Sequence, residues 1–168
     1  AYWSQPYEPT RWEVETLEAL AEAAATAVDN IGFAARLSLD RSPTPLSPDL
    51  IAGDYKADIE AIAGIAAVPT MLDVALRTTK MGFAAIARVT ETRWITCSSL
   101  DNVGFGLKPG DELPIESTLC NEIRDHQQPI VFDDASVDDR YRDHHTPRIY
   151  GLRSYISMPI IREDGTFW

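Results

Sequence analysis

Cys120 combines a reactive side chain with a position that can activate it. Ser117 or Thr118, just before it, can cap a helix, so that Cys120 falls in the first helical turn. There the helix dipole favours the thiolate, which is the nucleophilic form of the side chain. Next to Leu119 and Ile123, however, a small semi-apolar residue more often serves as core. Thiol chemistry and simple packing therefore both stand as interpretations of Cys120.

The other reactive side chains gather in a polar stretch at residues 133–153, which we call the lid segment. It holds His144 and His145 among several carboxylates. Imidazoles can hydrogen-bond to a bound molecule, stack on it or titrate near neutral pH, although adjacent histidines in so polar a loop often face solvent. They are weak metal ligands here, because adjacent histidines point apart on most backbones and no two histidines lie four residues apart. We therefore expect no metal site.

The apolar run at residues 154–161 is typical of a β-strand that carries ligand contacts on one face. Side chains alternate across a strand, so Tyr155 and Ser157 share one face while Ile156, Met158 and Ile160 share the other. We expect Tyr155 and Ser157 to face a ligand.

A shorter run at residues 130–133 is interpreted in the same way. Alternation separates Val131 and Asp133 from Ile130 and Phe132. We expect Asp133 to supply a polar contact to the ligand.

The elements that must position these residues form an antiparallel sheet with helical support. Residues 83–90 and 93–99 are two β-type runs separated by Glu91-Thr92, which is typical of a hairpin. Two helical segments precede them from residue 52 onward, with Pro69 at the start of the second, and residues 112–117 form a short edge strand. The predicted fold class is α+β, with a central antiparallel sheet, helices on one face and a lidded pocket on the other.

The N-terminal region combines a strand end with a long helix. Residues 1–3 are extended in pattern, and Thr10 with Glu13 three residues later predicts a helix start. The apolar stripe of this helix can pack on the sheet or pair with the same helix of a second subunit. It consists of Val14, Leu17, Ala21, Ala24, Val28 and Ile31. A proline-rich linker follows at residues 37–52.

Charge and composition exclude several partners. The chain has 15 basic and 26 acidic residues and a net charge of −11, which repels nucleic acid. No apolar run approaches the roughly 20 residues of a membrane helix, so we expect no membrane contact. Two cysteines fit reduced thiols and a cytoplasmic location. Because the chain lacks an initial Met and stops just after the turn signal Asp164-Gly165, we expect a piece of a longer protein.

Three motifs in order resemble a known family. They are Gly-Leu-Lys-Pro-Gly-Asp-Glu-Leu-Pro-Ile-Glu-Ser-Thr-Leu-Cys at 106–120, Pro-Ile-Val-Phe-Asp-Asp at 129–134, and Tyr-Gly-Leu-Arg-Ser-Tyr-Ile-Ser-Met-Pro-Ile at 150–160 followed by Asp164-Gly165. Over residues 57–168 the chain resembles GAF domains, which are related to PAS domains. It is most similar to the sensory GAF domains of bacterial histidine kinases.

The resemblance implies a small-molecule sensor, without naming its ligand or cofactor. The family's pocket lies between the sheet and the segments that cover it, here the 101–110 loop, the Cys120 helix and the lid segment. The implied ligand contacts are Phe105, Cys120, Asp133, Tyr141, His144, His145, Tyr150, Tyr155 and Ser157. A ligand that orders the lid segment would change the packing of terminal helices and bias an output domain, so the module itself is not an enzyme.

The resemblance also leaves alternatives open. Residues 53–168 are expected to form a GAF domain that is cut before its last strand and helix. Residues 1–36 are either the last strand and helix of an upstream GAF domain or a helix that completes the domain of residues 53–168. A homodimer through the terminal helices is expected. Free methionine sulfoxide reductases of the family imply a redox enzyme using Cys120, and a ligand-free dimerisation module is a third possibility. The lid segment lacks the cysteine with which phytochrome relatives attach pigment. The glycine-containing loop at residues 101–110 lacks a spacing that would cradle phosphate.

Overall fold

The computed structural model describes residues 1–38 and 55–168, without the side chains of residues 31–38. Most of the linker predicted at residues 37–52 therefore lies outside the described residues, and residues 37 and 38 belong to the end of the first helix.

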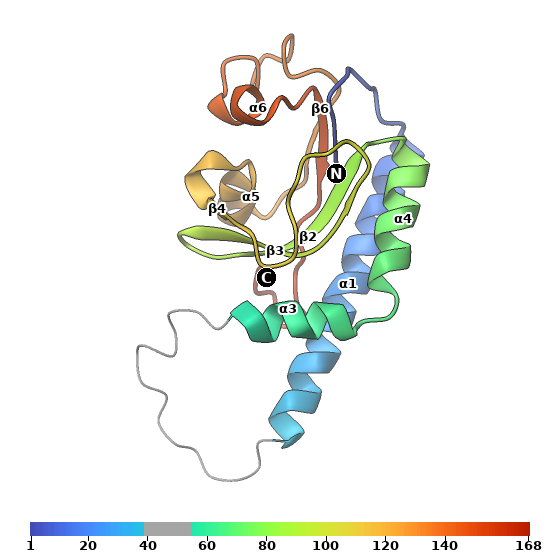
Figure 1. Cartoon of the computed structure of the whole chain (residues 1–168), viewed down its shortest axis with the longest axis vertical. Coiled ribbons are helices and arrows are strands. Elements are labelled where there is room, and N and C mark those ends of the chain that lie inside the picture. Colours follow the sequence, from blue (N-terminus) through green and yellow to red (C-terminus); the bar gives the residue numbers. More distant parts are fainter. Residues whose placement is uncertain (39–54) are drawn as a thin grey trace.

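A curled antiparallel sheet of six strands forms the centre of the described structure (Figure 1). The strand order across the sheet is β4-β3-β2-β1-β6-β5, and every pairing is antiparallel. The strands are β1 (Tyr2–Trp3), β2 (Phe83–Val89), β3 (Arg93–Asp101), β4 (Glu112–Pro114), β5 (Ile130–Phe132) and β6 (Ser154–Ser157). The predicted hairpin is confirmed as β2 and β3, and the predicted edge strand as β4.

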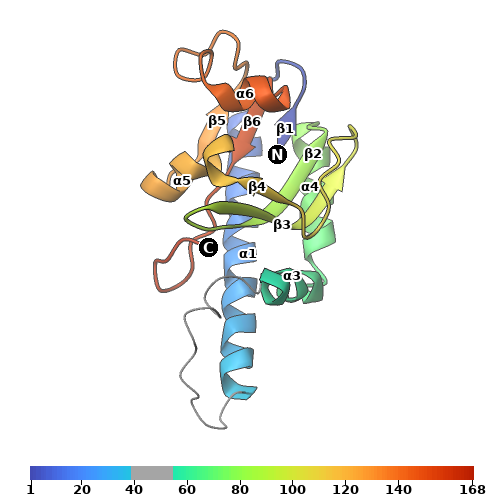
Figure 2. The same cartoon turned by 60° about the vertical axis from the view of Figure 1, so that its left-hand side comes forward.

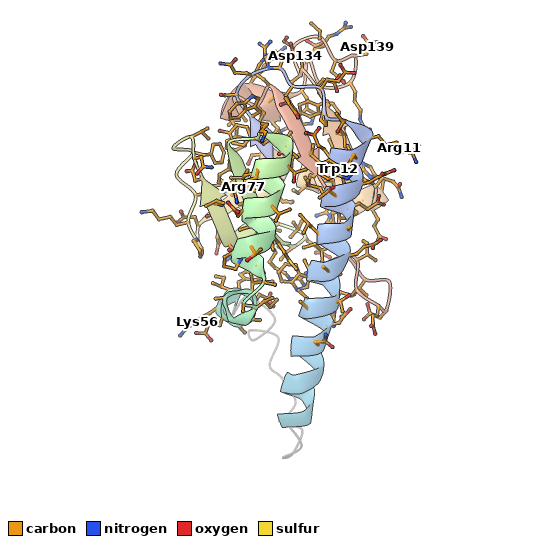
Figure 3. The ribbon with its side chains drawn as sticks, turned by 90° about the vertical axis from the view of Figure 1, so that its right-hand side faces the viewer. Arg11, Trp12, Lys56, Arg77, Asp134 and Asp139 are labelled. Carbon is orange, nitrogen blue, oxygen red and sulfur yellow. The ribbon has the colours of Figure 1, made fainter. Side chains whose placement is uncertain are left out.

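Three helices cover one face of the sheet, as Figure 2 shows with α1 behind the strands. They are α1 (Arg11–Ser38), α3 (Tyr55–Gly64) and α4 (Val68–Thr79). Helix α4 packs on β2 and β3, and α1 lies beside α4 (Figure 3). The core between them includes Leu17, Leu72, Leu76, Ile86 and Ile156.

The opposite face is covered by shorter elements. They are the 3-10 turn η1 (Ile115–Ser117), α5 (Cys120–His126) and α6 (His145–Tyr150). A second core lies beneath them and includes Phe83, Leu119, Ile123 and Phe132. The predicted α+β architecture, with helices on one face and covering segments on the other, is confirmed.

Helix α1 begins where the sequence predicts, because Thr10 and Glu13 satisfy each other's backbone groups. The Thr10 N–H donates to the Glu13 carboxylate (2.7 Å) and the Glu13 N–H donates to Thr10 Oγ1 (3.3 Å). This reciprocal capping box satisfies donors that the first helical turn leaves free.

The start of α5 differs from the prediction that Ser117 or Thr118 caps it. Leu119 occupies the cap position and makes no side-chain cap hydrogen bond. Both hydroxyls serve the preceding turn, since Ser117 Oγ donates to the carbonyl of Pro114 (2.7 Å) and Thr118 Oγ1 to that of Ile115 (2.8 Å). Helix α6 was not expected at all within the polar lid segment.

Strand β1 lies in the middle of the sheet although it comes first in the chain. Tyr2 pairs with Phe83 of β2 on one side and with Tyr155 of β6 on the other. The carbonyl of Trp3 accepts a hydrogen bond from the Arg153 N–H (2.9 Å).

Candidate functional site

A cavity of about 210 Å³ lies beside β1, and residues of its neighbours β2 and β6 line it as well. Its lining includes Phe105, Cys120 and Tyr155 from the side of the covering segments, and Leu17 and Met71 from the side of the long helices. The cavity therefore contacts the lid side and the helix side of the sheet together.

One group of polar side chains on the cavity wall lies near the first turn of α5. Cys120 Sγ lies 3.8 Å from the Tyr155 hydroxyl, and Ser157 lines the same wall. Burial raises the pKa of the Cys120 thiol, although hydrogen bonds with Tyr155, Trp94 and Ser157 oppose the shift. Burial also raises the pKa of Tyr155 well above its usual value. Both groups are therefore neutral near pH 7 and act as hydrogen-bonding partners.

Four aromatic side chains of the cavity wall contact one another. Phe105 packs against Tyr2, Phe83 and Tyr150 with ring centroids 5.0, 4.9 and 5.9 Å apart. Such edge and tilted contacts add to the burial of the rings. They connect the 101–110 loop, the sheet and α6 around the cavity.

Asp101 shapes the loop that carries Phe105. Its carboxylate accepts hydrogen bonds from the N–H groups of Val103 (3.0 Å), Gly104 (2.9 Å) and Gly106 (2.8 Å). Burial alone would raise the pKa of Asp101, but these backbone donors outweigh it and lower the pKa. Gly104 and Gly106 adopt positive φ angles of 75° and 96°, which side chains rarely tolerate.

Helix α6 is fastened to the rest of the covering layer by three hydrogen bonds to η1. The Ser117 hydroxyl lies 2.7 Å from the Tyr150 hydroxyl, Thr146 Oγ1 donates to the Ser117 carbonyl (2.9 Å), and His145 Nε2 lies 2.7 Å from the Glu116 carbonyl. We call these three contacts the lid latch.

His144 connects the lid segment to α5. Its Nδ1 accepts from the Thr146 N–H (3.2 Å) and so caps α6, while Nε2 lies 3.2 Å from Glu122 Oε1. Since Nδ1 is an acceptor, the neutral ring carries its proton on Nε2 and donates it to Glu122. Burial lowers the pKa of His144, the neighbouring charge of His145 lowers it further, and Glu122 opposes both.

The structure brings five of the nine candidate residues together at the cavity. Phe105, Cys120, Tyr150, Tyr155 and Ser157 all line it. The alternation predicted for β6 also holds, since Ile156, Met158 and Ile160 pack with the helix-side core.

The other four candidates lie outside the cavity lining. Tyr141 is buried behind it against Phe132, with ring centroids 4.7 Å apart. His144 and His145 stack on each other, with ring centroids 4.5 Å apart, and make the contacts to α5 and η1 described above.

Asp133 requires a correction. Its side chain is exposed, and the inward face of β5 belongs to Ile130 and Phe132. Val131 packs with the helix-side core instead. The predicted choice of faces for this strand was wrong. The larger apolar side chains, Ile130 and Phe132, face the covering segments, and alternation then places Val131 and Asp133 on the opposite side.

Several lining residues were not among the candidates. They include Tyr2, Trp94, Leu107, Thr118 and Leu119. Trp94 and Leu119 flank elements that the sequence does predict, so their alternation along a strand and a helix could have indicated them. Tyr2 could not be found in this way, because its position depends on a pairing with strands more than 80 residues away.

Two further properties concern the described residues only. Residues 1–38 and 55–168 contain no group of three or more His, Cys, Asp or Glu side chains that could hold a metal ion. None of the helices in this part of the chain is by itself long and apolar enough to cross a membrane, whereas α3 and α4, bent by 78°, meet the criteria of length and composition only as a pair.

Comparison with protein families decides the assignment. The family model of the GAF domain matches residues 65–168, which is more than half of the chain. The chain belongs to the GAF domain family. A GAF domain is in general a small-molecule-binding sensory module and typically a regulatory unit rather than an enzyme. No curated protein matches the chain.

Proposed function

We propose that this GAF domain is the ligand-sensing input of a bacterial signal-transduction protein whose output is a histidine kinase. The observation that carries the proposal is the composition of the cavity wall. Phe105 and Tyr150 belong to the covering layer, whereas Leu17 and Met71 belong to α1 and α4. A molecule in the cavity would contact both layers, so its binding free energy would depend on how the helices pack.

In this proposal residues 1–36 complete the domain that residues 53–168 begin. The pairing of β1 with β2 and β6 supports it, as does the hydrogen bond from the Tyr7 N–H to the Asp133 carbonyl (2.9 Å). Helix α1 then connects the cavity to whatever follows Ser38. The alternative is that residues 1–36 end an upstream GAF domain. A double-mutant cycle of Gly82→Ala and Trp3→Ala distinguishes the two possibilities.

A homodimer through the terminal helices and a cytoplasmic location belong to the same proposal. Trp12 projects from α1 with 65 % of its surface exposed (Figure 3), and exposed tryptophans are enriched at protein interfaces. Both cysteines are free, as the cytoplasm favours. Light scattering should show a dimer that Trp12→Ala weakens and that Arg77→Ala, an exposed change on α4, leaves intact. An unchanged dimer in Trp12→Ala removes this face of α1 from the interface.

The environment of Cys120 does not favour the redox alternative. Burial raises the pKa of its thiol, and a catalytic thiol needs the opposite shift. The only other cysteine, Cys97, packs in the helix-side core. No observation favours this alternative over ligand sensing.

The sensing proposal is tested by titrating the chain with a panel of small metabolites and following hydrogen exchange. A ligand that binds should slow or speed amide exchange in both α6 and α1, because the cavity touches the layers to which both belong. The double variant Tyr155→Ala/Ser157→Ala should lose this response, and Lys56→Ala, an exposed change on α3, should retain it. Binding that is equal in all three proteins, or that leaves exchange in α1 and α6 unchanged, would contradict the proposal.

A further inference from the structure

Within residues 1–38 and 55–168, no charged side chain described in the structure lines the cavity. Among its lining residues there is no Asp, Glu, Lys, Arg or His. The backbone nitrogen of Ala1 also reaches the lining, where it donates to the Ile156 carbonyl (2.6 Å). A ligand with a carboxylate or phosphate would therefore enter without a counter-charge, which is strongly unfavourable in an apolar site.

The arginines near the lid segment are committed elsewhere. Arg153 pairs with Asp134 (2.8 Å), Arg148 with Asp143 (3.1 Å) and Arg142 with Asp139 (3.3 Å). None of these arginines lines the cavity. The described residues thus offer no guanidinium to a nucleotide phosphate in the cavity.

Three polar side chains of the wall hydrogen-bond to groups of η1. Thr118 Oγ1 donates to the Ile115 carbonyl, Thr146 Oγ1 donates to the Ser117 carbonyl, and the Tyr150 hydroxyl pairs with Ser117. Cys120, Tyr155 and Ser157 lie together near the first turn of α5 and hydrogen-bond to one another, and Trp94 joins them through Cys120. Tyr2 and Trp168 also contribute polar side chains to the lining. Cys120 Sγ lies 3.8 Å from the Tyr155 hydroxyl, and because a thiol is a weak partner, a ligand oxygen or nitrogen can offer this hydroxyl a stronger hydrogen bond.

The volume sets the size of the occupant. A cavity of about 210 Å³ exceeds the roughly 150 Å³ of an apolar cavity that binds benzene. It can hold about one or two fused rings. The surrounding aromatic side chains Tyr2, Phe83 and Phe105 suit a flat apolar molecule.

We propose that the ligand is a neutral, flat and largely apolar molecule with a single hydrogen-bonding group that meets Tyr155 and Ser157. This inference rests on the sensing function proposed above and gives its ligand a chemical class. The rings lie against the aromatic wall, and the polar group lies near the first turn of α5. Specificity against anions comes from the missing counter-charge.

The test uses a pair of probes with the same shape and different charge. Indole-3-carboxamide is neutral, and indole-3-carboxylate is an anion near pH 7. Calorimetric titration of the chain should give a dissociation constant at least about tenfold lower for the carboxamide, because burying the unpaired carboxylate costs more than about 1.4 kcal/mol. Tyr155→Phe should weaken the carboxamide several-fold and leave naphthalene, which has no polar group, unaffected. Tyr55→Phe, a tyrosine outside the cavity, is the matched control.

The outcomes separate the ligand class from the sensing function. Equal binding of the two indole probes, or no binding of either at millimolar concentration, overturns the inference. Equal loss of carboxamide and naphthalene binding in Tyr155→Phe overturns the polar contact. Selective carboxamide binding without any change of exchange in α1 and α6 supports the ligand class and contradicts the sensing function instead.

Discussion

Gly82 offers a direct test of whether β1 belongs to this sheet. The residue lies just before β2, and its N–H donates to the Tyr2 carbonyl (3.1 Å). A Cβ placed there would lie 2.2 Å from Val103 Cγ1 and 2.8 and 3.0 Å from two carbons of the Trp3 ring. Side chains never approach so closely, so the Gly82→Ala variant must displace Val103, Trp3 or both.

The magnitude follows from which neighbour can move. Val103 is exposed and can change rotamer, whereas Trp3 packs against the helix-side core and its backbone is paired to β6. Overpacking of this kind costs about 1–3 kcal/mol. The smaller entropy of the unfolded alanine chain offsets about 0.4–1 kcal/mol of that. We expect Gly82→Ala to lower the free energy of unfolding by about 1–2 kcal/mol and Tm by roughly 2–8 °C.

A double-mutant cycle assigns the cost to the Trp3 ring. In Trp3→Ala the ring is absent, so adding Gly82→Ala should cost little and the coupling should reach about 1 kcal/mol. Urea unfolding followed by circular dichroism measures all four proteins. Gly64→Ala is the control, since a Cβ at the end of α3 meets nothing within 4 Å and should be neutral or slightly stabilising.

Additive effects of the two changes would refute the placement of β1 and favour an upstream origin for residues 1–36. Coupling that depends on protein concentration would instead indicate that β1 is exchanged between copies of the chain. Coupling that is independent of concentration supports the closed domain.

Three further predictions concern the folded chain. The pKa of His144 is lower in the folded chain than its value near 6.5 in the unfolded chain. As pH decreases between these two values, the unfolded chain is protonated at His144 while the folded chain is not. The free energy of unfolding should therefore fall through this range. Urea unfolding at several pH values should show this slope, and His144→Gln should flatten it. The pKa of Asp29 is lowered in the folded chain, first by the hydrogen bond from the Glu163 N–H and then by the Arg162 guanidinium. The stabilisation that Asp29 provides is therefore present above its unfolded pKa of about 4 and is lost as pH falls through its folded pKa. Asp29→Asn should reduce the acid dependence of unfolding. Ile156 is 0 % exposed, so Ile156→Ala should lower the free energy of unfolding by about 2–5 kcal/mol in the same urea unfolding assay.

The sequence predicts those parts of the fold whose signals are local. The hairpin of β2 and β3 has a turn between two β-type runs, and α1 has the capping box of Thr10 and Glu13. Each of these features is decided by residues that are close together in the chain. For the same reason, the alternation of Tyr155 and Ser157 in β6 was predicted well.

The parts that the sequence did not predict depend on distant partners. Helix α6 lies in a polar segment without an apolar stripe, and it forms where His144 caps it and Ser117 fastens it. The faces of β5 were exchanged in the prediction because Asp133 was chosen for its polarity, while burial of Phe132 decides the orientation. A search for the larger apolar face would have given the correct assignment.

The covering layer with α6 is held by hydrogen bonds, whereas α1 and α4 meet the cavity through apolar contacts alone. We expect this difference to determine which layer responds more to a bound ligand. The lid latch uses protein groups alone, three hydrogen bonds of about 0.5–1.5 kcal/mol each, and none of them uses the hydroxyls of Tyr155 or Ser157. The α1 and α4 residues of the wall, which include Leu17 and Met71, offer only apolar contacts there. Apolar packing depends on the volume that fills the cavity, whereas the hydrogen bonds of the latch depend on it less. If a ligand binds in the cavity as proposed, we therefore expect amide exchange to change more in α1 than in α6.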